Sequence, residues 1–351
     1  MENQIQTPHK RRVRYKGKYP KKFEEKYKEL QPEKYKDTIE HVIQKGNTPA
    51  GMHISIMVKE IIDFLNIQPG EIGFDATLGY GGHTKAMLKC LNGKGHIYAT
   101  DVDPEESDKT KKRLADQGFG EDLLTVKLQN FCTIDEIAKE VGGFDFILAD
   151  LGVSSMQIDN PKRGFSFKVD GPLDLRLNQD AGISAAERLD TITRDELAGM
   201  LYENSDEPYC EELAKAITDE IRKGNRIDTT TKLRQVIEKT LDFLPEKEKK
   251  DTIKKTCQRT FQALRIDVNR EFEVLYEFME KLPDALRPGG RVAILTFHSG
   301  EDKLVKKALK EGYKAGIYSD YAKDVIRPSA QECAQNGRAR STKMRWAVKN
   351  K

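Results

Sequence analysis

The stretch GFDATLGYGGHTKAMLK, residues 73–89, decides the fold class, because it has the order of a strand, a glycine-rich turn and the start of a helix. Many nucleotide-binding sheets begin in this way. A dinucleotide fingerprint would need a third spaced glycine where the chain has Thr84, and no Gly-Lys-Ser/Thr of a phosphate loop follows. The turn therefore predicts a nucleotide-like ligand that is held without a complete pyrophosphate cradle.

The chain beyond residue 53 alternates short apolar runs with helical stretches, which is typical of a parallel sheet covered by helices on both faces. Pro104 suits the first turn of one of these helices, where a missing N–H costs little. We expect LRPGG, residues 286–290, to close another helix before a strand. The pattern predicts an α/β, Rossmann-like fold with strands at residues 73–77, 96–101, 124–128, 144–150 and 291–297, and a final strand at 344–349.

A long insertion interrupts this alternation. About 140 residues separate the strand that ends at Asp150 from the one that begins at Arg291, far more than a crossover between parallel strands needs. Most of this span has helical patterning, with Thr193 and either Asp228 or Thr229 as expected N-caps. We therefore predict four segments: a basic N-terminal extension (1–50), a first part of the sheet domain (51–155), an inserted helical substrate domain (156–260) and a second part of the sheet domain (261–351).

The formal net charge of +3 hides a basic segment at the start of the 351-residue chain. Residues 1–50 carry +6 and the remainder −3, and eight Lys or Arg, two Tyr and no acid lie between Pro8 and Lys22. This mixture suits phosphate contacts and base stacking, and the alternative is a solvated tail. No apolar run reaches the length of a membrane span and no apolar signal core is present, so we expect a soluble, cytoplasmic protein. Five scattered cysteines predict reduced, mostly buried thiols and no metal site.

The position of one acidic residue bears on the ligand. In such sheets an acid at the end of the second strand takes the ribose hydroxyls, and Asp101 has this position, roughly 20 residues after the turn. NAD and S-adenosylmethionine share that contact, but NAD also needs the pyrophosphate cradle that is incomplete here. The amino-acid end of S-adenosylmethionine needs a carboxylate and a closely approaching backbone, which Asp75 and the glycines supply. The residues therefore favour S-adenosylmethionine, with a nicotinamide oxidoreductase as the alternative.

In a methyltransferase the end of the fourth strand faces the transferred methyl group, so we expect Asp150 and the following turn to line the reaction site. The block FDFILADLGVSSMQIDNPKRGFSFKVDGPLDLRLN, residues 144–178, resembles the small-subunit (16S) ribosomal RNA cytosine-N4 methyltransferase family of the MraW type, whose pattern reads DLGVSSPQLD, RGFSF and DGPLDMRM. The resemblance continues in residues 260–271, 289–307 and 336–345. It implies a class I S-adenosylmethionine-dependent methyltransferase with an inserted helical substrate domain.

The resemblance also implies functional residues, at the positions of this chain that match the family's motifs. Asp101 would hold the ribose and Phe131 the adenine, while the backbone near Gly81 would approach the methionine end. A helix cap is the alternative for His83, and a core position is the alternative for Phe131. The implied cofactor-binding residues are Gly81, Gly82, His83, Asp101, Phe131, Asp150 and Gln157, and the implied catalytic residues are Asp150, Ser154 and His298; no metal is implied.

The implied reaction depends mainly on positioning, because methyl transfer is an in-line displacement. The exocyclic N4 of cytosine is a poor nucleophile, since its lone pair is delocalised into the ring. An acceptor must therefore take an N–H proton, and the base must leave its stack. Asp150 is the leading candidate for this acceptor, although a cofactor contact could occupy its carboxylate. Other amino-methyltransferases have an Asn/Asp-Pro-Pro-aromatic turn here, whereas this chain and the family have Asp-Leu-Gly-Val.

Further candidates follow the fifth main strand or lie in the insertion. His298 and Ser299 could hold the cytidine, with a helix cap as the alternative. Four arginines could bind phosphates of the RNA, with structural ion pairs as the alternative: Arg163, Arg176, Arg259 and Arg265.

The chain departs from the family's motifs at residues 53–56, 204–207 and 255–258 and at Gly300. Several of these departures fall in segments expected to meet RNA, so the resemblance implies the reaction but not the nucleotide. We expect N4-methylation of a cytidine in 16S ribosomal RNA. The alternatives are a different RNA cytidine, or a ribosome-assembly factor that binds the cofactor without turnover. The expected partner is ribosomal RNA or the small ribosomal subunit, with a homodimer left open and no membrane.

Overall fold

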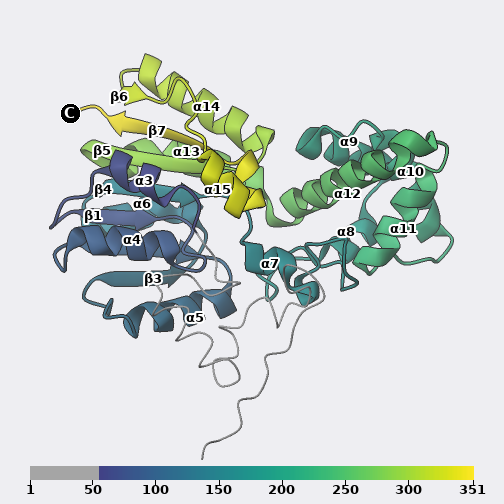
Figure 1. Ribbon diagram of the computed structural model, residues 1–351, viewed down its shortest axis with the longest axis horizontal. Helices are drawn as coiled ribbons and strands as arrows, with labels where there is room; N and C mark the ends of the chain where they lie inside the picture. Colours follow the sequence, from purple (N-terminus) through teal and green to yellow (C-terminus); the bar gives the residue numbers. More distant parts are fainter. Residues whose placement is uncertain (1–54) are drawn as a thin grey trace, which may run out of the picture. The chain divides into compact units, whose positions relative to one another are not determined.

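The computed structural model describes residues 55–351, so the predicted basic extension lies outside the described residues. Seven strands form one sheet in the order β3-β2-β1-β4-β5-β7-β6 (Figure 1). The first five strands run parallel, and β7 pairs antiparallel with both β5 and β6. The strands are β1 Ile72–Asp75, β2 His96–Asp101, β3 Leu124–Leu128, β4 Phe144–Asp150, β5 Leu286–Thr296, β6 Tyr318–Tyr321 and β7 Lys343–Lys349.

Helices cover both faces of this sheet, because the central strands are apolar on both sides. In β4, Phe146 and Leu148 point to one face, while Ile147 and Ala149 point to the other. The first face packs against α3 (Val58–Leu65), α4 (Gly82–Leu91) and α5 (Pro104–Ala115). The second packs against α6 (Ile134–Val141), α13 (Glu271–Ala285) and α14 (Ser299–Lys314). The predicted α/β, Rossmann-like fold is confirmed.

A helical insertion between β4 and β5 has a hydrophobic core of its own, in which Leu197, Leu213, Leu233 and Leu264 are fully buried. Figure 1 shows its helices packed on one another beside the sheet domain. They are α8 Ala185–Thr191, α9 Arg194–Ser205, α10 Cys210–Arg222, α11 Thr230–Thr240 and α12 Glu246–Asn269, and they follow the short α7 Ser155–Asp159.

The last helix of the insertion leads directly into the sheet domain. Helix α12 continues without a break through residue 260, where we expected the insertion to end, so the predicted domain boundaries stay predictions. The helix ends where Arg270 takes a left-handed conformation (φ 52°), and α13 begins at the next residue. Asn269 joins the two ends of the insertion, because its side chain accepts a hydrogen bond from Leu177 N (2.7 Å) and donates one to the Leu175 carbonyl (2.8 Å).

Local sequence signals explain most helix starts. Thr193 caps α9 in a reciprocal capping box with Glu196. Thr229, rather than Asp228, caps α11. Pro104 stands at the first position of α5, as predicted, behind the capping carboxylate of Asp103.

The last strands differ from the predictions in two places. The segment LRPGG does not precede β5 but forms its first residues, with an irregular register where β5 passes Phe144 and Phe146. Gly289 provides the positive φ of 76° that this irregularity needs. The edge strand β6 was not predicted, since its sequence YSDY has no alternation of apolar and polar residues. The final strand β7 begins one residue before the predicted 344–349 and ends with it.

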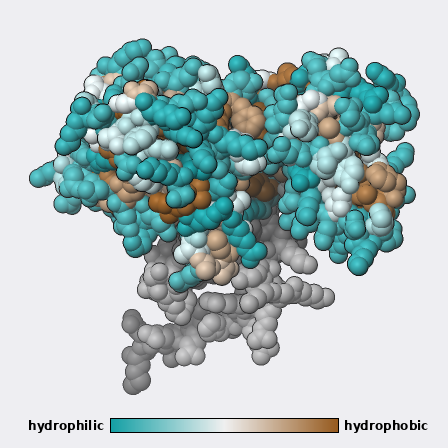
Figure 2. Space-filling model, turned by 90° about the horizontal axis from the view of Figure 1, so that it is seen from above, coloured by the Kyte–Doolittle hydropathy of each residue, from teal (hydrophilic) through white to brown (hydrophobic). Residues whose placement is uncertain are grey.

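The surface of the described residues is predominantly polar. Figure 2 shows small hydrophobic patches separated by hydrophilic residues on the face in view. Large exposed apolar side chains, such as Leu128, Tyr202 and Phe243, are spread over different elements, as is usual for globular proteins. Within residues 55–351, no helix is both long and apolar enough to cross a bilayer. All five cysteines are free thiols, but only Cys257 is buried, so the prediction that most of them are buried is wrong.

Candidate cofactor and reaction site

The carboxyl ends of β1, β2 and β4 bring three aspartates to one edge of the sheet. These strands are neighbours and run parallel, and they end at Asp75, Asp101 and Asp150. The backbone N–H of Asp150 donates to Thr77 Oγ1 (2.8 Å), which ties the end of β4 to the loop after β1. This is the edge at which open α/β sheets bind their ligands.

The glycine turn after β1 is held over the end of β2 by Asp101. One oxygen of this carboxylate accepts a hydrogen bond from Gly79 N (2.8 Å), and the other accepts one from Asp103 N (2.9 Å). Burial raises the pKa of Asp101 to about 6, although these backbone donors act in the opposite direction. Each carboxylate oxygen can accept a second hydrogen bond, so Asp101 is suited to two further donors such as ribose hydroxyls.

The two glycines at the start of α4 are required by packing within the chain itself. Gly81 has a φ of 74°, which favours glycine, and a Cβ there would lie 2.7 Å from Thr110 Cγ2. A Cβ on Gly82 would lie 2.0 Å from Ser55 Oγ. The predicted cofactor contacts of both glycines stay predictions, but their close packing already explains why larger residues do not fit.

Asp75 does not present the open carboxylate that we expected for the amino-acid end of the cofactor. It is 1% exposed, and its oxygens accept hydrogen bonds from Thr84 Oγ1 (2.6 Å) and Thr77 N (3.1 Å). Burial raises the pKa of Asp75, against the effect of these donors. Thr84, the residue that replaces the third glycine of a dinucleotide fingerprint, therefore stabilises the turn through its hydrogen bond to Asp75.

His83 bridges the chain before α3 and the end of β4. Its Nε2 lies 2.8 Å from the Ile56 carbonyl, and its Nδ1 lies 3.4 Å from Asp150 Oδ2. Burial acts to lower the pKa of His83, but Asp150, the Ile56 carbonyl and Asp75 together outweigh it, so the pKa is raised. His83 does not cap α4, since Gly81 has that position. The other oxygen of Asp150, Oδ1, is buried and has no hydrogen-bond partner among residues 55–351.

Gln157 and Ser154 form a capping box at the start of α7. Gln157 Oε1 accepts from Ser154 N (2.9 Å), and Gln157 Nε2 donates to Asp103 Oδ2 (3.1 Å). Arg163 donates to the same oxygen (2.6 Å) and also to the carbonyls of Arg176 and Leu177. Asp103 therefore joins helix α5 to both α7 and the insertion. Asp103 is not among the residues predicted from the sequence, where its one visible signal is its place before Pro104.

Phe131 begins a short 3-10 helix after β3 and is partly buried. Its ring meets Phe278 of α13 edge to face, with 5.2 Å between the ring centroids. One edge of the Phe131 ring therefore packs against the core, as the alternative to a cofactor contact predicted. The predicted contact of Phe131 with adenine stays a prediction.

His298 is the N-cap of α14, in a reciprocal box with Glu301. Its Nε2 lies 3.2 Å from Glu301 Oε1 and close to Glu271, and Phe272 contacts the ring edge to face. Burial would raise the pKa of Glu301, but the contacts with His298, the Phe297 N–H and Arg265 together outweigh it and lower this pKa. Arg265 binds both oxygens of Glu271 (2.7 and 2.9 Å), so an arginine already neutralises this acidic cluster. The helix-cap alternative for His298 is thus realised, and its catalytic role stays a prediction.

Close, largely buried ion pairs hold three of the four arginines that we considered for phosphate binding. Arg163 pairs with Asp103, Arg176 with Asp174, and Arg265 with Glu271, all at 2.6–2.9 Å and largely buried. Arg259 is the exception, because its side chain is 39% exposed and lies 4.0 Å from Glu207. The ion-pair alternative therefore describes the first three, while Arg259 is open to solvent.

The strand order, the antiparallel β7 and the acidic residues at the ends of β1, β2 and β4 define a class I methyltransferase fold. A sequence model of the MraW methylase family matches residues 50–350. The chain belongs to this family, which confirms the resemblance found in its motifs.

Curated relatives extend this match. A protein of Agathobacter rectalis named ribosomal RNA small subunit methyltransferase H 1 is 88% identical over 341 residues, which cover 97% of this chain and 98% of its own length. A protein of the same name from Lachnoclostridium phytofermentans is 70% identical over 348 residues, or 99% of this chain and 95% of its own length. Ribosomal RNA small subunit methyltransferase H of Fusobacterium nucleatum is 38% identical over 310 residues, covering 84% and 95%. The first two matches include most of the basic extension, which precedes the family model.

Proposed function

We propose that this methylase transfers a methyl group from S-adenosylmethionine to the N4 atom of a cytidine in the RNA of the small ribosomal subunit. The observation that carries the proposal is the carboxylate of Asp150, at the end of β4. One of its oxygens faces the His83 ring, and the other is buried without a hydrogen-bond partner in residues 55–351. A buried acceptor without a donor is costly unless a ligand supplies one, and the amino group of cytosine is such a donor.

The residues at the strand ends fit the cofactor in the same way. Asp101 keeps two acceptor positions for the ribose hydroxyls, and Phe131 offers a partly exposed ring for the adenine. The backbone of Gly81 and Gly82 leads directly into His83, whose ring contacts Asp150. When bound there, S-adenosylmethionine supplies an activated methyl group on a positively charged sulfur. The negative charge of Asp150 also favours that positive charge.

Asp150 then acts on the amino group of the substrate. Oδ1 accepts a hydrogen bond from N4, which draws the nitrogen lone pair out of conjugation with the ring. N4 forms its bond to the methyl carbon as the carbon–sulfur bond breaks, and the bonding electrons remain on sulfur. The N4 proton passes to Oδ1 and from there to solvent. His83 holds Oδ2 throughout, so the carboxylate keeps its orientation.

The names of the three relatives, all of which concern the small-subunit ribosomal RNA, support the proposed RNA partner. The enzyme acts where that RNA is made and assembled, in the cytoplasm. A homodimer remains a prediction that sedimentation of the purified protein tests.

The decisive experiment combines purified protein with small ribosomal subunits from cells that lack the gene. S-adenosylmethionine with a labelled methyl group serves as the donor, and mass spectrometry of RNA fragments locates the product. We expect N4-methylcytidine at one position, absent from the same RNA before the reaction. Label at a different base would assign another RNA substrate, whereas tight binding without label would favour an assembly factor.

A further inference from the structure

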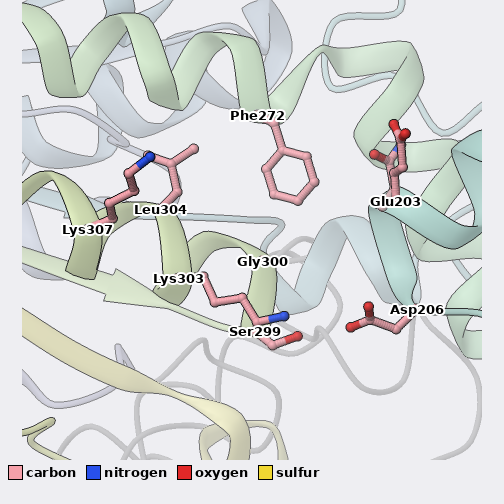
Figure 3. Close-up of a pocket in the computed structure, with 9 residues that line it drawn as sticks. Glu203, Asp206, Phe272, Ser299, Gly300, Lys303, Leu304 and Lys307 are labelled. Carbon is pink, nitrogen blue, oxygen red and sulfur yellow. The ribbon is translucent and has the colours of Figure 1, made fainter.

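An open cavity of about 350 Å³ lies between the helical insertion and the start of α14 (Figure 3). Its volume is in the range of cavities that bind small ligands or parts of larger ones. One wall is the first two turns of α14, the opposite wall is the end of α9, and Phe272 of α13 lies between them. The cavity therefore lies between the helical insertion and the sheet domain.

This cavity lies beside the reaction site. Helix α14 follows β5 directly, and Leu295 of β5 pairs with Asp150 of β4. A Cβ on Gly152, two residues after Asp150, would lie 3.7 Å from the ring of Phe297, the residue before the His298 cap. A nucleotide adjacent to the target cytidine would consequently be within reach of the cavity, because successive nucleotides are covalently joined.

Phe272 provides an aromatic surface in the cavity. Figure 3 shows its ring pointing into the space between the side chains of α14 and the carboxylates of α9. Gly300 makes room for the ring, since a Cβ at that position would lie 2.5 Å from Phe272 Cζ. His298 fixes the ring from a second side by an edge-to-face contact at 5.7 Å. A fixed aromatic ring beside open space is a typical stacking platform for an unpaired base.

The two walls carry opposite charges that are not neutralised within the described chain. Lys303 and Lys307 are one helical turn apart on α14, and both are exposed. Glu203 and Asp206 lie on the opposite wall, and both are exposed. Across residues 55–351, none of these four side chains forms an ion pair or a side-chain hydrogen bond. A nucleotide has the complementary arrangement, with an anionic phosphate at one end and N–H donors on the edge of its base at the other.

We propose that this cavity binds the RNA nucleotide next to the target cytidine. Its base stacks on Phe272, its phosphate contacts Lys303 and Lys307, and the N–H groups of its base donate to Glu203 or Asp206. Guanine fits best, because its N1–H and amino group present two adjacent donors to one carboxylate. Holding this neighbour fixes the backbone on one side of the target and keeps the flipped cytidine in place. The assignment rests on the proposed function, since it takes RNA as the substrate.

The test compares variants of the full-length protein with matched controls. Phe272→Leu keeps an apolar side chain but removes the stacking face. Its control is Tyr276→Leu, which removes an exposed aromatic ring from the same helix outside the cavity. The double change Lys303→Gln and Lys307→Gln removes the phosphate contacts. Its control is Lys306→Gln with Lys310→Gln, which removes equal charge from exposed positions of the same helix outside the cavity. Melting temperature and S-adenosylmethionine affinity, both expected to be unchanged, show that each variant is folded.

We expect Phe272→Leu to raise the KM for small subunits, and to weaken their equilibrium binding, by about tenfold, the scale of one lost base stack. Tyr276→Leu should behave like the wild type, and the cavity lysine pair should lose clearly more RNA affinity than the control pair. RNA affinities of Phe272→Leu and the cavity lysine pair equal to those of the controls would overturn the assignment. A wild-type protein that binds subunits without methylating them would instead overturn the proposed function, and the binding comparison would still decide the role of the cavity.

Discussion

His83 and Asp150 form a buried pair in which Nδ1 lies 3.4 Å from Oδ2, while the opposite ring nitrogen, Nε2, lies 2.8 Å from the Ile56 carbonyl. Both partners of the ring are acceptors, so both nitrogens are best satisfied as donors, that is, in the imidazolium form. The raised pKa of His83 agrees with this arrangement. The pair thus fixes the carboxylate that we propose for the reaction.

This pair predicts a pH-dependent contribution to stability. The folded-state pKa of His83 is above its unfolded value of about 6.5, so the stabilisation is complete below that value and is lost as pH rises through the folded pKa. His83→Gln removes the titrating group. We expect the difference in unfolding free energy between wild type and His83→Gln, measured in urea without cofactor, to shrink from pH 6 to pH 9. A difference that grows over this range would contradict the imidazolium assignment.

Asp101 predicts that cofactor binding depends on pH in the opposite direction to the His83 contribution, because affinity is lost as pH falls. Its pKa of about 6 means that the carboxylate becomes protonated as pH falls below 6, when it accepts fewer hydrogen bonds. The dissociation constant of S-adenosylmethionine should therefore be level above pH 7 and rise on acidification. Asp101→Ala should weaken binding by about 1.5–3 kcal/mol, the scale of hydrogen bonds to a charged group. Calorimetry measures both effects, and Asp101→Asn should lack this pH dependence. Unchanged affinity in a folded Asp101→Ala protein would remove Asp101 from the ribose role.

Asp150→Ala should abolish detectable methylation, because it removes the proposed proton acceptor. Asp145→Ala is the matched control, since Asp145 is on the same strand and pairs with Arg287 at the opposite end. It should keep turnover despite some loss of stability. The measurement is labelled methyl incorporation with saturating cofactor and RNA. Near-normal turnover of Asp150→Ala would exclude the carboxylate from the chemistry.

The buried pair of Arg163 and Asp103 predicts a large effect on stability. Arg163→Ala leaves the Asp103 carboxylate, 2% exposed, without its cation, and should lower the unfolding free energy by about 3–5 kcal/mol. Lys59→Ala, which breaks the exposed pair of Lys59 with Asp63, should change it far less, because solvent screens this pair. Denaturant unfolding followed by circular dichroism compares the two. Equal effects would show that the Arg163 pair is not a structural link.

The basic extension predicts a salt effect on RNA binding alone. Its eight basic residues between Pro8 and Lys22 can each neutralise a phosphate, and each contact with single-stranded RNA steepens the fall of log affinity with log salt by about 0.7. If half of them engage, deletion of residues 1–46 should flatten that slope by about 3 units, while S-adenosylmethionine affinity and the methylated position stay the same. Filter binding over a salt series provides the measurement. Identical slopes would indicate a solvated tail.

Local patterns in the sequence were sufficient for the five main strands and for the caps at Thr193 and Thr229, because each depends on neighbouring residues. They also located Asp101 and Asp150 at strand ends. They did not reveal that Asp103 joins Gln157 and Arg163, since this contact spans about 60 residues of the chain. Nor did they show that two departures from the family's motifs, residues 204–207 and Gly300, meet in one cavity. Such relationships arise from tertiary packing, which no short window of sequence contains.

The two hydrogen bonds of the Asn269 side chain to the backbone of Leu175 and Leu177, here called the clasp, bear on the order in which the protein folds. Strands β4 and β5 are neighbours in the sheet, yet the whole insertion separates them along the chain, and closing so long a loop costs conformational entropy. If the insertion folds first, the clasp brings its two ends together and much of that cost is met before the strands pair. The pairing of β4 with β5, here called the seam, then forms last. Because Asp150 lies on this seam, a mutation in the distant core of the insertion can abolish activity without altering a residue of the site.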